Sequence, residues 1–126
     1  MAVKQVRYGE IVEVTFKFPG EGFKVHPALV LSGSNLQENE DGMFYAVLIS
    51  SKNYNPQYTL EIKNEWLTAP MLRQSYFITH FMTYFTPDEV SQSYRIAVRK
   101  EYMDGIISKV IRSIFEWDIE ADEEKP

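Results

Sequence analysis

The segment Gly9–Ser32, GEIVEVTFKFPGEGFKVHPALVLS, constrains the fold of this chain more than any other part. Residues Glu10–Phe18 alternate between apolar and polar side chains, which is the period of a half-buried strand. Pro19–Gly22 supplies turn residues, because proline fixes φ and glycine accepts positive φ. His26–Ser32 then resumes as a short apolar run. The segment therefore predicts a β-hairpin in which Pro27, which has no N–H to donate, lies near a strand start or on an edge.

The remainder of the chain continues mainly as strands. The segment Gly33–Gly42 is polar and predicts a loop. The ambiguous segment Asn64–Arg73 carries Trp66 and Leu67, which we expect to anchor a loop on the core. Strands are predicted by runs of apolar, β-branched and aromatic residues at Met43–Ser51, Gln57–Lys63, Gln74–Phe85 and Tyr94–Val98.

Two helices are predicted after the long aromatic strand. Thr86–Glu89 has the pattern of a helix start, with threonine as N-cap, proline at the first helical position and glutamate closing a capping box. Lys100–Phe115 carries one apolar stripe with helical spacing. Five or six strands in meander order, a short capped helix and a C-terminal packing helix predict a small α+β, mostly β, barrel-like domain.

Charge is distributed unevenly along the chain. The formal net charge is −5, and the last eleven residues, 116–126, hold six acids and one base. The other twelve acids and twelve bases therefore cancel over residues 1–115. We expect one neutral domain over 1–115 and an acidic, disordered extension over 116–126. A neutral domain lacks the broad basic face that is typical of tight nucleic-acid binding.

Length and composition exclude several classes of protein. A chain of 126 residues can bury a core without disulfides or metal, and the absence of cysteine excludes thiolate ligands and a cysteine nucleophile. No run of eighteen apolar residues occurs, and the N-terminus lacks the apolar segment of a secretion signal. We expect a cytoplasmic protein with no membrane segment, no metal and no cofactor.

Four stretches, in order, resemble the MazF/PemK family of small bacterial toxins that cut single-stranded RNA. The clearest is His26–Ser32, which is similar to an Arg-Pro-Ala-Leu-Val-Ile-Ser strand of that family. Two others are an opening strand at Tyr8–Val12 and a strand at Phe44–Ser51 that carries Ser50. The last is a long strand followed by a short helix and then a terminal helix, at Ser75–Phe85, Thr86–Glu89 and Met103–Phe115. The resemblance implies an SH3-like barrel, a homodimer and an antitoxin partner.

The resemblance also implies where catalytic residues lie. The family's arginine before the proline is His26 here, and Ser50 takes the position of its catalytic threonine or serine. A second arginine of the long strand falls near Thr83. Lys24 restores a positive charge in the loop, and Ser51 supplies another hydroxyl. His26 and Ser50 are thus the catalytic candidates, with Lys24, Ser51 and Thr83 as substrate-binding candidates.

Metal-independent RNA cleavage needs a base for the 2′-hydroxyl, an acid for the leaving oxygen and positive charge at the phosphate. His26 can do acid–base chemistry near neutral pH, but it cannot hold a phosphate with two parallel hydrogen bonds as arginine does. The alternative is that His26 is a surface histidine of an edge strand and that Ser50 and Ser51 only form a turn.

For the other residues with functional potential, the structural interpretation is the favoured one. His80 lies among aromatic residues, which is typical of a buried histidine, and its distance from His26 cannot be predicted. The tyrosines can stack on bases, although tyrosine with phenylalanine more often builds a core or a dimer face. The acidic extension can be a solvated tail or a cover for a basic groove.

Two hypotheses follow for function. The first is a toxin of a toxin–antitoxin system that cuts single-stranded RNA without metal, with a divergent active site. The second is a non-catalytic binding or interaction module that keeps the toxin barrel and has lost the catalytic arginines.

Overall fold

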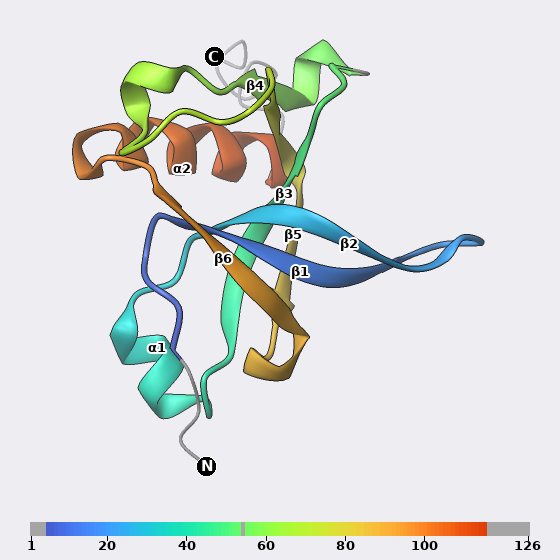
Figure 1. The fold of residues 1–126 in the computed structure, drawn as a ribbon, viewed down its shortest axis with the longest axis vertical. Helices are drawn as coiled ribbons and strands as arrows, with labels where there is room; N and C mark the ends of the chain where they lie inside the picture. Colours follow the sequence, from blue (N-terminus) through green and yellow to red (C-terminus); the bar gives the residue numbers. More distant parts are fainter. Residues whose placement is uncertain (1–4, 54, 116–126) are drawn as a thin grey trace, which may run out of the picture.

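The computed structural model describes residues 5–53 and 55–115, and in this part of the chain six antiparallel strands form one sheet (Figure 1). The sheet order is β4-β5-β3-β2-β1-β6. The strands are β1 (Glu10–Phe18), β2 (Gly22–Val30), β3 (Phe44–Ser50), β4 (Thr59–Glu61), β5 (Tyr76–Phe85) and β6 (Val90–Ala97). The helices are α1 (Ser34–Asn39) and α2 (Lys100–Ile114), with 3₁₀ turns η1 (Pro56–Tyr58), η2 (Asn64–Trp66) and η3 (Pro87–Glu89).

This architecture confirms the predicted α+β, mostly β, barrel-like class, with one difference in strand order. The meander holds only through β1, β2 and β3, because β3 pairs with β5 and β6 returns to pair with β1. The short capped element is a single 3₁₀ turn, in which the Thr86 N–H donates to Glu89 Oε1 at 2.8 Å. The predicted acidic extension 116–126 and Tyr54 lie outside the described residues.

The β1–β2 hairpin projects from the body of the molecule (Figure 1). Its strands pair from Ile11 opposite Leu29 to Phe18 opposite Gly22, so β2 begins at Gly22 rather than His26. Gly22 and Gly20 have φ values of +77° and +78°, which favour glycine in this turn. On the other side, β3 pairs β2 only over Ala28–Val30. Pro27 therefore lies where β2 has lost one neighbour, as expected for proline.

Gly9 fixes the contact between the start of β1 and the end of β6. It has a φ of +86°, and a Cβ atom there would lie 3.3 Å from the Val98 carbonyl oxygen. Its N–H donates to the Val30 carbonyl and its carbonyl accepts from the Val98 N–H, both at 2.8 Å. Glycine is needed here because the backbones approach closely in a left-handed conformation.

Both faces of the central strands are buried, so the core has two parts. One part lies against α2 and is built by Ile11, Leu29, Val47, Ile49, Ile62, Leu67, Phe77, Val98, Met103, Ile106 and Val110. The other is built by Val6, Val12, Val14, Ala28, Val30, Phe44, Ala46, Leu48, Ile78 and Phe85. Leu67 is buried and Trp66 packs against the first part, which confirms their predicted anchoring role.

The segment Gly33–Gly42 forms helix α1, so the prediction of a polar loop was wrong. The helix is held by Gln37, whose side chain is almost fully buried. Gln37 Nε2 donates to the Val6 carbonyl at 2.8 Å, and the Val6 N–H donates to Gln37 Oε1 at 3.1 Å. This pairing joins residues 31 positions apart, so a local pattern of polar residues could not reveal it.

Helix α2 matches the predicted Lys100–Phe115 closely, but its buried face is mixed. Met103, Ile106 and Val110 are buried, whereas Ile111 and Phe115 are exposed. The Thr79 hydroxyl donates to the Tyr58 carbonyl at 2.9 Å, so the 2.8 Å bond between Thr79 and Ser113 is donated by Ser113. This polar contact holds the C-terminal half of α2 to β5. The predicted strand Gln57–Lys63 is shortened to β4, because Pro56–Tyr58 forms η1.

Candidate active site

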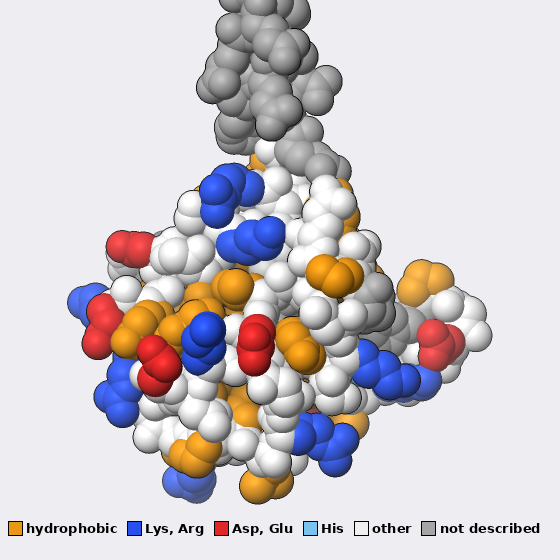
Figure 2. Space-filling model, turned by 90° about the horizontal axis from the view of Figure 1, so that it is seen from above, with side chains coloured by type: hydrophobic (Ala, Val, Ile, Leu, Met, Phe, Trp, Pro, Cys, Tyr) orange, Lys and Arg blue, Asp and Glu red, His pale blue; other side chains and the backbone are white. Residues whose placement is uncertain are grey.

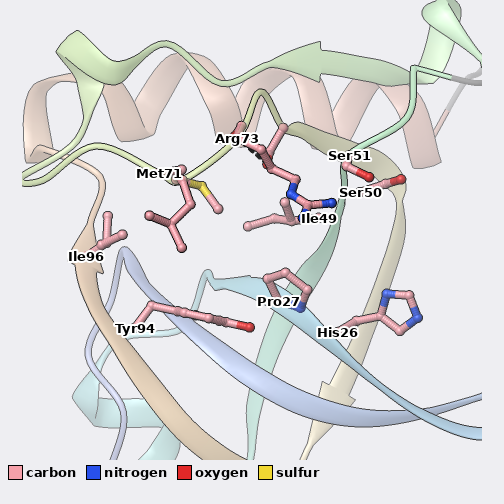
Figure 3. A pocket seen from close by; sticks show the side chains of 11 residues that line it. His26, Pro27, Ile49, Ser50, Ser51, Met71, Arg73, Tyr94 and Ile96 are labelled. Carbon is pink, nitrogen blue, oxygen red and sulfur yellow. Dashed lines mark hydrogen bonds between the residues drawn. The ribbon is translucent and has the colours of Figure 1, made fainter.

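A cavity of about 370 Å³ lies where β2, the end of β3, the segment 71–75 and β6 meet. Figure 3 shows it from close by. We call it the hairpin-base cavity. Apolar and polar side chains both line it. The lining residues are His26, Pro27, Ile49, Ser50, Ser51, Met71, Leu72, Arg73, Ser75, Tyr94 and Ile96. The structure therefore brings together three of the predicted site residues, His26, Ser50 and Ser51.

His26 borders the cavity from β2, opposite Val14 of β1. Its ring lies at the margin, on the side of the cavity where Ser50 and Ser51 also lie (Figure 3). Burial lowers the pKa of His26 below its ordinary value of 6.5, and the positive charge of Lys24 lowers it further, against the opposing effect of Glu21. His26 is therefore a neutral imidazole at pH 7, which can accept a proton.

Ser50 and Ser51 stand at the end of β3. Ser50 lies opposite Tyr76 of β5, and the Lys52 N–H donates to Ser50 Oγ at 3.0 Å. This bond caps the turn, as the structural interpretation of the two serines expects. It also fixes the position of the Ser50 oxygen while leaving the hydroxyl hydrogen available to a bound group. Ser50 can therefore cap the turn and donate a hydrogen bond to a bound group at the same time.

Arg73 is the cation of the cavity, and the sequence analysis missed it. Its guanidinium extends from the segment 71–75 toward Pro27 and Ile49 (Figure 3). The Ser75 hydroxyl donates to the Arg73 carbonyl at 3.1 Å and steadies the backbone there. Arg73 closes the segment 64–73, whose pattern predicted neither helix nor strand. No local signal in that segment distinguishes Arg73 from any other surface arginine.

Tyr94 of β6 forms the opposite wall. Its hydroxyl points into the cavity and donates to Glu13 Oε2 at 3.2 Å, which ties β6 to β1 (Figure 3). Burial, the charge of Glu13 and this hydrogen bond together raise the pKa of Tyr94 above 10. Tyr94 therefore keeps its proton at neutral pH and orders the wall of the cavity.

Three other residues of interest do not line this cavity. Lys24 lies farther out on the hairpin, where its Nζ is 2.7 Å from Glu21 Oε1 in an exposed ion pair. Thr83 is opposite Ala46, near the other end of β3 from Ser50. His80 lies between the rings of Tyr58 and Phe81, and its buried Nδ1 has no hydrogen-bond partner among residues 5–53 and 55–115. His80 therefore does not share the cavity with His26.

The surface shows no broad field of one charge on the face seen in Figure 2, where basic and acidic side chains are interspersed. Among residues 5–53 and 55–115, no group of three or more acidic or histidine side chains is arranged to hold a metal ion. Neither helix in these ranges is long and apolar enough to cross a membrane. The positive charge at the cavity thus comes from Arg73 rather than from a basic surface.

The six-stranded sheet with its two helices has the barrel fold of the MazF toxins, as comparison with solved structures shows. No family model and no curated protein sequence matches the chain. Among solved structures, MazF from Deinococcus radiodurans superposes with a TM-score of 0.70 at 14% identity, covering 90% of this chain and 99% of that one. The toxin MazF-mt6 of Mycobacterium tuberculosis gives 0.62 at 10% identity, with 86% and 98% covered.

A third similar structure is an endoribonuclease from a mycobacterial species, solved in complex with its cognate antitoxin. It superposes with a TM-score of 0.62 at 14% identity, covering 88% of this chain and 95% of that one. The likeness extends over nearly the whole described chain, so the SH3-like barrel of the MazF toxins is confirmed as the fold. At such low sequence identity the likeness shows the fold alone, so any chemistry must be argued from the residues of the cavity.

Proposed function

We propose that this chain is a toxin of a toxin–antitoxin pair that cuts single-stranded RNA without metal. The observation that carries the proposal is the meeting of His26, Ser50 and Arg73 around one cavity, although they come from three separate parts of the chain. The MazF barrel supports it, since the similar structures include an endoribonuclease with its antitoxin.

The three side chains match the needs of RNA transphosphorylation. Neutral His26 takes the proton of a 2′-hydroxyl, whose oxygen attacks the adjacent phosphorus. The P–O bond to the 5′ oxygen breaks, and the imidazolium returns the proton to that oxygen. The products are a 2′,3′-cyclic phosphate and a 5′-hydroxyl. The guanidinium of Arg73 and the hydroxyl of Ser50 stabilise the charge on the phosphate oxygens.

The same proposal covers the partners. We expect an antitoxin to bind the hairpin-base cavity and the projecting hairpin, and a second copy of the chain to cover part of the exposed apolar surface. Exposed large apolar side chains include Tyr45, Tyr84, Ile111 and Phe115. Residues 1–115 would act as one domain in the cytoplasm, with 116–126 as an acidic extension. Lys24, Ser51 and Thr83 remain proposals as RNA contacts.

The test is cleavage of a long single-stranded RNA by the purified full chain in the presence of a chelator. Replacing His26 by alanine should lower the rate by about 10²–10⁴-fold, as expected for loss of a general acid–base group. Arg73→Ala should lower it comparably, and Ser50→Ala less. Arg112→Ala, which removes an exposed charge from α2, is the matched control and should cleave normally. A His26→Ala protein with the wild-type rate would refute the assignment.

The second candidate is a module that binds without cutting. It is favoured by two observations: Thr83 lies away from the cavity, and position 26 holds no arginine. Under this alternative, the wild-type chain binds RNA or a protein partner, releases no cyclic phosphate and causes no growth arrest when expressed.

A further inference from the structure

A second pocket lies on the other side of strand β6. It has a volume of about 650 Å³ and is lined mainly by Arg7, Tyr8, Glu10, Ser93, Arg95 and Ile96. Ile96 borders this pocket and the hairpin-base cavity as well. The two sites are therefore separated by a single edge strand, over which an extended chain molecule can pass from one to the other.

Arg95 enters this second pocket through an unusual backbone. Its φ is +58°, which is rare for a residue other than glycine, asparagine or aspartate. The register of β6 against β1 shifts here, from Ile96 opposite Ile11 to Ser93 opposite Val12, so Tyr94 and Arg95 form a bulge. The Arg95 N–H donates to Ser93 Oγ at 3.0 Å. Strained residues of this kind persist only where the surrounding structure holds them, and they cluster at active sites and ligand clamps.

The charges of the pocket favour an anion. Arg7 and Arg95 are both exposed, and within the described residues neither guanidinium has an ion pair. The acidic residue that lines the pocket is Glu10, whose Oε1 already accepts the Arg7 backbone N–H at 2.9 Å. The charge of Asp104 acts on Tyr8 from outside the lining. Tyr8 adds a ring that is 39% exposed. Two guanidinium groups beside an aromatic ring match a phosphate and its neighbouring base.

We infer that this pocket is a second phosphate-binding subsite for single-stranded RNA. The strand crosses β6 beside Ile96, with the phosphate to be cleaved at Arg73 and a neighbouring phosphate of the same strand at Arg95 and Arg7. The choice of RNA as ligand rests on the proposed function, whereas the location of the subsite rests on the pocket, its two arginines and the bulge. The site adds affinity without contacting the reacting atoms.

The first test measures binding of a labelled RNA octamer in which 2′-O-methyl groups prevent cleavage. Arg95→Ala and Arg7→Ala should each weaken binding about three- to tenfold, and each should flatten the plot of log K against log salt by about 0.7. Arg112→Ala should leave the affinity and the slope unchanged. Wild-type affinity and slope in both Arg95→Ala and Arg7→Ala would overturn the subsite.

The second test locates the contact on the RNA. In a set of octamers, one phosphate at a time is replaced by an uncharged methylphosphonate. At a position near the cleaved bond, this replacement should weaken binding to the wild type but not to Arg95→Ala, as expected for a shared contact. Absence of any such position overturns the proposal. If the octamers bind with this pattern and the wild type never cuts unmodified single-stranded RNA, the subsite is supported and the proposed function is refuted.

The third test separates binding from folding. Arg95→Gly removes the side chain but suits the positive φ, so its free energy of unfolding should equal or exceed that of Arg95→Ala. Both variants should bind the octamer equally weakly, and Arg95→Lys should recover part of the affinity. An Arg95→Gly protein that binds as tightly as the wild type would overturn the role of the side chain.

Discussion

The inner and outer halves of the β1–β2 hairpin share one continuous set of antiparallel residue pairs, but the inner half is buried and the outer half is exposed to solvent. In the inner half, Ile11, Leu29 and Val30 are fully buried. In the outer half, Phe23 and Val25 are 71% and 55% exposed, although they continue the same paired strand. The inner half therefore belongs to the core, whereas the outer half is free to present side chains to a partner.

The difference between the halves explains where the candidate chemistry lies. His26 and Pro27 occupy the boundary, where β3 no longer pairs with β2. On the inner side of this boundary a polar group would have to be satisfied within the core, and on the outer side it would be hydrated like any surface group. At the boundary, His26 is partly buried and its pKa is lowered, which gives a base held by a rigid strand.

The largest expected effect is a loss of stability in the inner half. Leu29→Ala should lower the free energy of unfolding by about 2–5 kcal/mol, because it removes a fully buried side chain and leaves a cavity. Urea denaturation followed by fluorescence measures this change. Val25→Ala, four residues earlier on the same strand, is the matched control and should change stability by less than about 0.5 kcal/mol. Equal losses in both variants would show that the two halves do not differ.

A smaller effect is expected at the boundary. The positive charge of Lys24 lowers the pKa of His26, whereas Glu21 raises it. Lys24→Ala removes the first effect and leaves the second, so the pKa of His26 should rise. Cleavage needs the neutral imidazole. As the pH is lowered, the variant should therefore lose activity at a higher pH than the wild type does. Titration of the His26 ring protons by NMR checks the direction, and a lower pKa in the variant would contradict it.

The smallest effect on stability is expected at the tip. Phe23 lies mostly in solvent, and the Nζ atom of Lys17 lies over its ring, 5.7 Å from the ring centre. Phe23→Ala should therefore change the free energy of unfolding by less than about 0.5 kcal/mol. Affinity for a partner bound to the outer half should nevertheless fall, as titration calorimetry with that partner would show. A large loss of stability in Phe23→Ala would contradict the solvent exposure of this side chain.

Sequence patterns located the strands well because most of them follow period-two alternation or aromatic runs. They located β1 exactly and missed α1, since Gln37 is held by Val6, far away in the chain. The strand order also escaped prediction. Between Val47 opposite Met82 and Ile49 opposite Phe77, four residues of β5 stand against one of β3. Such a bulge depends on packing with β4 and α2, which no local pattern encodes.

The candidate site was predicted only in part, for a related reason. His26 and Ser50 were predicted because their strands resemble strands of the toxin family. The structure places both residues at one cavity. Arg73 lies in a segment without periodicity, so only the folded chain shows that its side chain enters the same cavity. Thr83 was assigned because the family's second arginine falls near it on the long strand, but the structure places Thr83 opposite Ala46, near the end of β3 that is far from Ser50.

The bulge in β6 also affects how this molecule can assemble with others. An edge strand ordinarily offers a row of N–H and C=O groups to which another chain can add a strand. Here Arg95 interrupts that row, and Thr68 occupies its C-terminal end by hydrogen bonds of 2.9 and 3.0 Å with Ala97. This edge is consequently a poor template for fibre growth or strand exchange, and association along it must proceed through side chains.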